Sequence, residues 1–233
     1  MQNNENGLIG VEGVPSDEKD AYAANYKAHR KGISHDKMIK AYDEWADNYD
    51  KDLCPGVYNG PEILARAVSQ QYVDEEEKRR VRILDVAAGT GRVGEELHKL
   101  GFRRIDALEP SEGMLEILRQ RGIYEKEWHD SIGYHQTKIE DGTYDCVVSA
   151  GGMGEGHMPI AALDEMIRVL KSGGLMIVVM REEYLSYVNE YVNKLEPHLN
   201  ELEANKKCKK VSRTVVPNYS FNKNGVVFVY QAL

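Results

Sequence analysis

A glycine-rich turn between an apolar strand and an amphipathic helix most constrains the fold of this chain. The run 81–86 predicts a buried strand, and Val93, Leu97 and Leu100 share one face of the helix that follows. Between them, Gly89 and Gly91 can adopt backbone angles that side chains disfavour, so a ligand can approach the chain closely. The helix start adds free N–H groups and the positive end of a dipole. This order predicts a ligand site at the first strand of an α/β sheet.

Two kinds of ligand fit this turn. Gly89, Gly91 and Gly94 satisfy the G-x-G-x-x-G pattern, and Glu109 stands where a dinucleotide site has its acidic residue. Asp85, however, lies four positions before Gly89, where a dinucleotide-binding strand is usually apolar. A carboxylate there can hold the N–H groups of the turn or reach a ligand amine through a water. Asp85 therefore favours another ligand, and an NAD-dependent oxidoreductase is the alternative.

Three motifs carry a resemblance to a known family. The stretch Asp85-Val-Ala-Ala-Gly-Thr-Gly91 resembles the first motif of the class I S-adenosylmethionine (SAM)-dependent methyltransferases, which often have a glycine in place of Ala87. The stretch 140–149 resembles the turn and fourth strand of that family, and 170–174 resembles the approach to its fifth strand. The resemblance begins near Tyr42 and indicates a methyltransferase-like subgroup. It implies SAM as cofactor and S-adenosylhomocysteine as product.

The alternation of strands and helices predicts an α/β fold with a doubly wound, parallel sheet. The resemblance implies a seven-stranded, mostly parallel sheet with one antiparallel strand, which is Rossmann-like and carries an N-terminal helical lid. We expect a flexible segment at 1–33, within which Ser16 begins a weakly supported helix, a lid at 34–80 and a SAM-binding core at 81–233. Residues 75–80 are interpreted as a solvated linker, and 183–202 as one long helix.

The resemblance also assigns residues to the cofactor. It places the lid tyrosines Tyr42 and Tyr49 near the methionine end of SAM, although an aromatic stripe that only docks the helix is the alternative. Glu109 is expected to bind the ribose hydroxyls and Asp130 the adenine amino group, with surface carboxylates as the alternative. The expected cofactor-binding set is Tyr42, Tyr49, Asp85, Ala87, Gly89, Thr90, Gly91, Glu109, Pro110, Met114, Asp130, Ser131, Ile132 and Ser149.

The methyl acceptor is expected beyond the fourth strand, where four glycines between positions 149 and 157 leave room for a substrate. His157 is the candidate catalytic base, although a histidine that packs the loop is the alternative. A base is needed only if the methyl acceptor must lose a proton. Further candidates for the lining of this region are Glu155, Tyr58, Tyr219 and Arg181.

Composition narrows the partners. A net charge of −8 argues against binding to a nucleic-acid backbone, and the basic run 206–210 is interpreted as a solvated turn. The fourth strand is not followed by the Pro-Pro-aromatic or Pro-Cys sequences of nucleobase methyltransferases. The three cysteines show no metal spacing, and no signal or membrane segment is apparent. We therefore expect a monomeric, cytoplasmic or nuclear protein without metal that modifies a small molecule or a protein. A non-catalytic SAM-binding regulator is the third hypothesis.

Overall fold

Seven strands form one sheet in the computed structural model, which describes residues 19–233. The strands are β1 (Arg82–Val86), β2 (Arg104–Leu108), β3 (Lys126–Trp128), β4 (Tyr144–Ala150), β5 (Leu170–Arg181), β6 (Cys208–Ser220) and β7 (Lys223–Ala232). Their order is β3-β2-β1-β4-β5-β7-β6, and only β7 runs against its neighbours. This confirms the predicted doubly wound sheet with one antiparallel strand.

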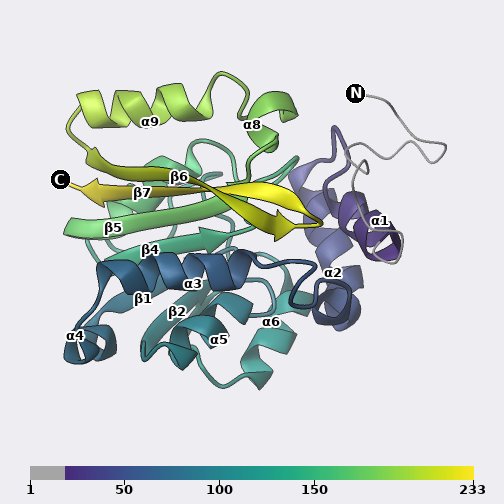
Figure 1. The fold of residues 1–233 in the computed structure, drawn as a ribbon, viewed down its shortest axis with the longest axis horizontal. Helices are drawn as coiled ribbons and strands as arrows, with labels where there is room; N and C mark the ends of the chain where they lie inside the picture. Colours follow the sequence, from purple (N-terminus) through teal and green to yellow (C-terminus); the bar gives the residue numbers. More distant parts are fainter. Residues whose placement is uncertain (1–18) are drawn as a thin grey trace.

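Helices cover both faces of the sheet (Figure 1). Within residues 19–233 they are α1 (Lys19–Ala28), α2 (His35–Asp52), α3 (Gly60–Gln71), α4 (Glu75–Arg80), α5 (Arg92–Lys99), α6 (Glu112–Gln120), α7 (Ala162–Val169), α8 (Tyr184–Tyr187) and α9 (Leu195–Ala204). Successive strand residues point to opposite faces, so Ile83 belongs to the apolar cluster that includes residues of α3 and α5, whereas Leu84 belongs to the cluster that includes residues of α7 and α9. None of these helices is both long and apolar enough to cross a bilayer.

Two segments differ from the sequence prediction. Residues 75–80 form the helix α4 rather than a linker, because Asp74 accepts a hydrogen bond from the Glu77 N–H at 2.8 Å and begins a helix. The single helix predicted over 183–202 is wrong. Asn193 has a left-handed φ of 55° between α8 and α9, and the nearby Tyr191 hydroxyl is buried against the loop after β4. The interruption allows Tyr191 to support that loop.

Helices α1 and α2 lie together at one end of the sheet (Figure 1). There α1 contacts α2 and α2 contacts α6, whereas α3 packs on α5, β4 and β5. Helix α1 falls within the segment expected to be flexible, at the position of the weakly supported helix. The polar stretch 1–15 and the Ser16 cap lie outside the described residues. The domain limits at residues 33 and 80 stay predictions.

Candidate functional site

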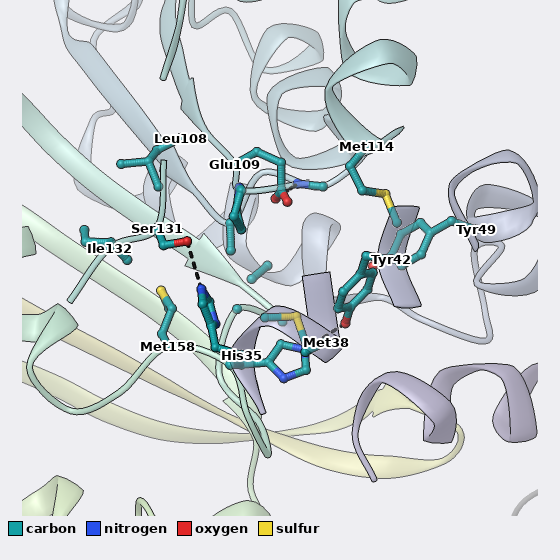
Figure 2. A pocket seen from close by; sticks show the side chains of 17 residues that line it. His35, Met38, Tyr42, Tyr49, Leu108, Glu109, Met114, Ser131, Ile132 and Met158 are labelled. Atoms are coloured by element: carbon teal, nitrogen blue, oxygen red, sulfur yellow. Dashed lines mark hydrogen bonds between the residues drawn. The ribbon is translucent and has the colours of Figure 1, made fainter. Parts of the chain in front are cut away.

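A pocket opens at the carboxyl ends of β1, β2 and β4, where the strand order changes direction (Figure 2). In open α/β sheets this is the usual place of a ligand site. The pocket contains about 590 Å³ of empty space, and α2 supplies its roof. It brings together most of the predicted site residues: Tyr42, Tyr49, Ala87, Gly89, Glu109, Pro110, Met114, Ser131, Ile132 and His157. We call it the first pocket.

The glycine turn is shaped for close approach. Gly89 has a φ of 56°, and no atom lies within 4 Å of the place that its Cβ would take. Ala87, where the family often has glycine, also adopts a left-handed φ of 54°. Such a conformation costs an alanine about 1–2 kcal/mol, so the surrounding structure must hold the turn in place. The turn therefore exposes its backbone and the Ala87 methyl group to the first pocket.

The other two glycines of the pattern accommodate Tyr124. A Cβ on Gly91 would lie 2.9 Å from the Tyr124 ring, and one on Gly94 would lie 2.4 Å from its hydroxyl oxygen. This hydroxyl accepts a hydrogen bond from the Gly94 N–H at 3.0 Å and donates one to Asp85 Oδ2 at 2.7 Å. Gly91 and Gly94 thus let an aromatic ring reach Asp85. The sequence analysis missed Tyr124. This residue lies after α6, and its spacing from the glycine motif gives no sign of a contact with Asp85.

Asp85 is fully buried at the end of β1. Its Oδ2 bonds to Tyr124 rather than to the N–H groups of the turn, and its Oδ1 has no partner among the described residues. Burial raises the pKa of Asp85 to about 7, against the lowering effect of the Tyr124 hydrogen bond. An unsatisfied buried oxygen is costly, so a ligand or water that donates to it would stabilise the site.

Glu109 follows β2 and faces the first pocket (Figure 2). Its Oε2 accepts a hydrogen bond from the Gly89 N–H, and its Oε1 accepts one from the Ser111 N–H, each at 2.8 Å. Burial raises the pKa of Glu109 to about 7 despite these two donors. The carboxylate therefore ties the glycine turn to the start of α6 and keeps its remaining lone pairs available.

Two Tyr-Asp pairs on α2, Tyr42-Asp43 and Tyr49-Asp50, hold the lid in place. Asp43 accepts hydrogen bonds from Ser111 Oγ at 2.6 Å and from the Gly113 N–H at 3.1 Å, at the start of α6. Asp50 accepts one from Thr90 Oγ1 at 2.6 Å and pairs with Arg121. Each pair thus directs its tyrosine to the first pocket and its aspartate to a neighbouring segment, the start of α6 or Thr90, so the stripe serves both docking and the site.

His157 lies in the first pocket, beside Tyr42. Its Nδ1 is 2.8 Å from the Glu155 carbonyl oxygen and must donate to it, because a carbonyl only accepts. Its Nε2 therefore accepts from the Tyr42 hydroxyl, also at 2.8 Å. Burial lowers the pKa of His157 to about 4, which keeps the ring neutral at physiological pH. His157 thus orients Tyr42, and its basic nitrogen is already occupied by this contact.

Five predicted cofactor residues do not line the first pocket: Asp85, Thr90, Gly91, Asp130 and Ser149. Thr90 bonds to Asp50 on the lid. Asp130 accepts from the Ser131 N–H at 2.7 Å and lies 2.8 Å from His135 Nε2. Ser149 is fully buried, and its Oγ has no partner among the described residues. These residues support the wall of the pocket and its loops from behind.

The structure adds lining residues that the sequence analysis missed. His35 and Met38 come from α2, two turns and one turn before Tyr42 on the same helical face (Figure 2). His35 donates to the Gly156 carbonyl oxygen at 3.2 Å and accepts from Ser131 Oγ at 2.8 Å. The spacing of the aromatic stripe, extended backwards to His35, could have identified both.

Comparison with known proteins bears on this site. Residues 83–174 match the family model of a methyltransferase domain. Human methyltransferase-like protein 27 is 32% identical over 167 residues, which cover 72% of this chain and 66% of the human protein. The chain belongs to the SAM-dependent methyltransferase family. It is also 35% identical to a demethylmenaquinone methyltransferase of Clavibacter sepedonicus, over 42% of this chain and 40% of that protein. The chain therefore spans less than two thirds of the length of both relatives.

A solved structure shares the methyltransferase fold. A TehB-like SAM-dependent methyltransferase from Corynebacterium glutamicum superimposes with a TM-score of 0.59 at 17% identity. The match covers 83% of this chain and all of the other. At this identity it supports the fold and leaves the methyl acceptor open.

Proposed function

We propose that this methyltransferase binds SAM in the first pocket and transfers its methyl group to a small molecule or a protein. The observation that carries the proposal is the pair of buried acids Asp85 and Glu109 at the ends of adjacent strands, with Gly89 open to the pocket between them. A ligand with hydroxyl, amine and sulfonium groups would supply donors to Glu109 directly and to Asp85, behind the turn, through a water, and its positive charge would favour both acids.

The residues present fit this cofactor. The unpartnered Oδ1 of Asp85 offers a buried acceptor behind the turn, and Glu109 offers a carboxylate to two neighbouring ribose hydroxyls. Met114 and Ile132 supply apolar surface for the adenine, while Tyr42 and Tyr49 face the same pocket from the lid. Asp130, Thr90, Gly91 and Ser149 act behind this surface, as supports rather than contacts.

The protein has little covalent chemistry to perform. Bound SAM supplies a methyl group on a positively charged sulfur, so a lone pair of the methyl acceptor forms the new bond while the carbon–sulfur electron pair returns to sulfur. Alignment of reacting atoms can lower a barrier by about 7–11 kcal/mol. The lid contributes to alignment through Tyr42, which His157 holds in place. This arrangement makes His157 a positioning residue.

Titration calorimetry with SAM, S-adenosylhomocysteine and NAD tests the cofactor. We expect heat from the two adenosyl compounds and none from NAD, because two of the three glycines accommodate Tyr124 instead of a pyrophosphate. Tight NAD binding without SAM binding would overturn the proposal. A labelled-methyl screen over metabolite and protein fractions then tests transfer. SAM binding without any methyl transfer would favour the third hypothesis, a non-catalytic SAM-binding regulator.

A further inference from the structure

A second chamber lies next to the first pocket, with about 370 Å³ of space between atoms when its opening to solvent is included. The two cavities share the lining residues Tyr42, Tyr49 and Gly151, so they are neighbours on either side of the α2 tyrosines and the exit of β4. Three residues expected to line a methyl-acceptor site, Tyr58, Tyr219 and Arg181, are in its wall, whereas Glu155 is not. If the proposed function is correct, this chamber is the place where the methyl acceptor binds.

The wall of the second chamber carries one permanent charge. Arg181, at the end of β5, is only 4% exposed and is the only Lys, Arg, Asp or Glu among the described residues that line the chamber. Its Nη1 lies 3.3 Å from Glu183, which is partly exposed and lines a different cavity on the surface. Within residues 19–233, no carboxylate lines the chamber itself. A buried cation favours an anion on its open side.

Ser220 completes a site for an anion. Arg181 Nε and Nη2 both donate to Ser220 Oγ, at 3.2 and 2.9 Å. Because these two contacts occupy both lone pairs of that oxygen, the Ser220 hydroxyl proton must be directed to another group. A guanidinium and a hydroxyl donor side by side match the oxygens of a carboxylate.

The remaining walls are neutral and aromatic. Tyr49, Tyr58, Tyr184, Tyr219 and Phe221 surround the space, and Tyr58 meets Tyr219 edge to face with centroids 5.4 Å apart. Such rings favour a flat, apolar guest. His29 also lines the chamber. Burial lowers the pKa of His29 well below its usual value, so its imidazole is neutral at physiological pH. A cationic amine would meet Arg181 without a compensating charge.

The end of α1 and the residue that follows it form one wall of the chamber. Asn25 and His29 form part of the wall, and His29 stacks on His157 with centroids 4.3 Å apart. A chamber lined by six Tyr and Phe rings, with Tyr42 as the sixth, suits a small guest better than an extended protein segment.

We propose that the second chamber binds a small aromatic carboxylic acid, with its carboxylate at Arg181 and Ser220 and its ring between the tyrosines. The opposite edge of the ring then faces Gly151 and the first pocket. Binding of the acid in the chamber does not depend on the proposed function. Only the identification of that acid as the methyl acceptor rests on it.

The test uses 4-hydroxybenzoate, its neutral amide and the amine tyramine as probes on the full chain, with and without S-adenosylhomocysteine. Calorimetry or ligand-observed NMR should show binding of the acid, binding of the amide weaker by about tenfold or more, and no binding of tyramine. Equal binding of acid and amide, or preferred binding of tyramine, would overturn the inference. If S-adenosylhomocysteine does not bind but the acid does, the proposed function alone fails.

A matched pair of variants locates the site. Asn25→Asp adds a carboxylate to the wall that Asn25 shares with Arg181, and should weaken binding of the acid by about tenfold while leaving S-adenosylhomocysteine binding unchanged. Asn205→Asp adds the same charge at the exposed end of α9 and should change neither. Equal effects of the two variants on the acid would show that net charge, and not the chamber, governs binding.

Discussion

The first pocket and the second chamber are built in opposite ways. The glycine turn of the first pocket follows β1, and its carboxylate Glu109 follows β2, while Asp85 lies behind the turn near the end of β1. The second chamber combines Asn25, Arg181 and Ser220, which come from α1, β5 and β6. The first has acidic groups at its edge and the second a cation. The proposed cofactor site is therefore encoded in short segments, whereas the proposed acceptor chamber depends on tertiary packing.

The largest expected difference between the two cavities is in their response to pH. In the ligand-free protein, burial raises the pKa values of Asp85 and Glu109 from 3.8 and 4.5 to about 7. Their protonated forms stabilise the fold fully below about pH 4, and this contribution is lost as the pH rises through about 7. The free energy of unfolding should fall by several kcal/mol over that range, while SAM affinity should rise because the ionised acids bind it better.

Urea unfolding and SAM titration at about pH 5 and about pH 8 measure both trends. The double variant Asp85→Asn/Glu109→Gln keeps the shape of the side chains. It should reduce the pH dependence of both the free energy of unfolding and the SAM affinity. A pH dependence that survives in this variant would assign it to other groups.

The next effect concerns Glu109 alone. Glu109→Ala should weaken SAM binding by about 1–3 kcal/mol, because it removes hydrogen bonds to a charged group. Calorimetry measures the change, and Glu116→Ala on the exposed face of α6 is the matched control. Binding of 4-hydroxybenzoate should stay the same in both variants. Unchanged SAM affinity would remove Glu109 from the site.

Loss of the lid anchor should have a smaller effect. Asp43→Ala removes the acceptor for Ser111 Oγ and the Gly113 N–H, and should lower the free energy of unfolding by about 0.5–2 kcal/mol, as for other helix caps. Asp47→Ala, one turn further along α2 and exposed, is the control for thermal and urea unfolding. Equal stability of the two variants would contradict the anchoring role of Asp43.

The smallest effect is expected at the boundary between the two cavities. Tyr42→Phe removes the hydroxyl that bonds to His157 and should reduce SAM affinity by about 0.5–1.5 kcal/mol. Tyr230→Phe, in β7 and outside both cavities, is the control. If Tyr42→Phe alters binding of 4-hydroxybenzoate but not of SAM, the hydroxyl belongs to the second chamber instead.

The sequence predicted the features that depend on local pattern. Asp85, Gly89 and Glu109 follow strands of recognisable apolar character, so their convergence at one edge of a parallel sheet was predictable. The stripe through Tyr42 and Tyr49 predicted a buried helix face. The direction of the neighbouring aspartates, toward α6 and Thr90, was not predicted, because it depends on how α2 docks.

Features that depend on long-range packing were missed or misread. Nothing near Tyr124 indicates that its hydroxyl reaches Asp85 across two glycines. The interruption between α8 and α9 depends on a left-handed Asn193 and on contacts of Tyr191 with residues far earlier in the chain. The role of His157 also follows from its contacts, since only the structure shows that its Nε2 is engaged by Tyr42.

The second chamber draws Asn25, Arg181 and Ser220 from outside the stretch 83–174 that matches the methyltransferase domain. If the proposals hold, changes confined to these parts of the two flanks could redirect the enzyme to a new compound, while the glycine turn and Glu109 within 83–174 stay intact. Chimeras that exchange only these flanks between relatives should inherit the substrate of the flank donor.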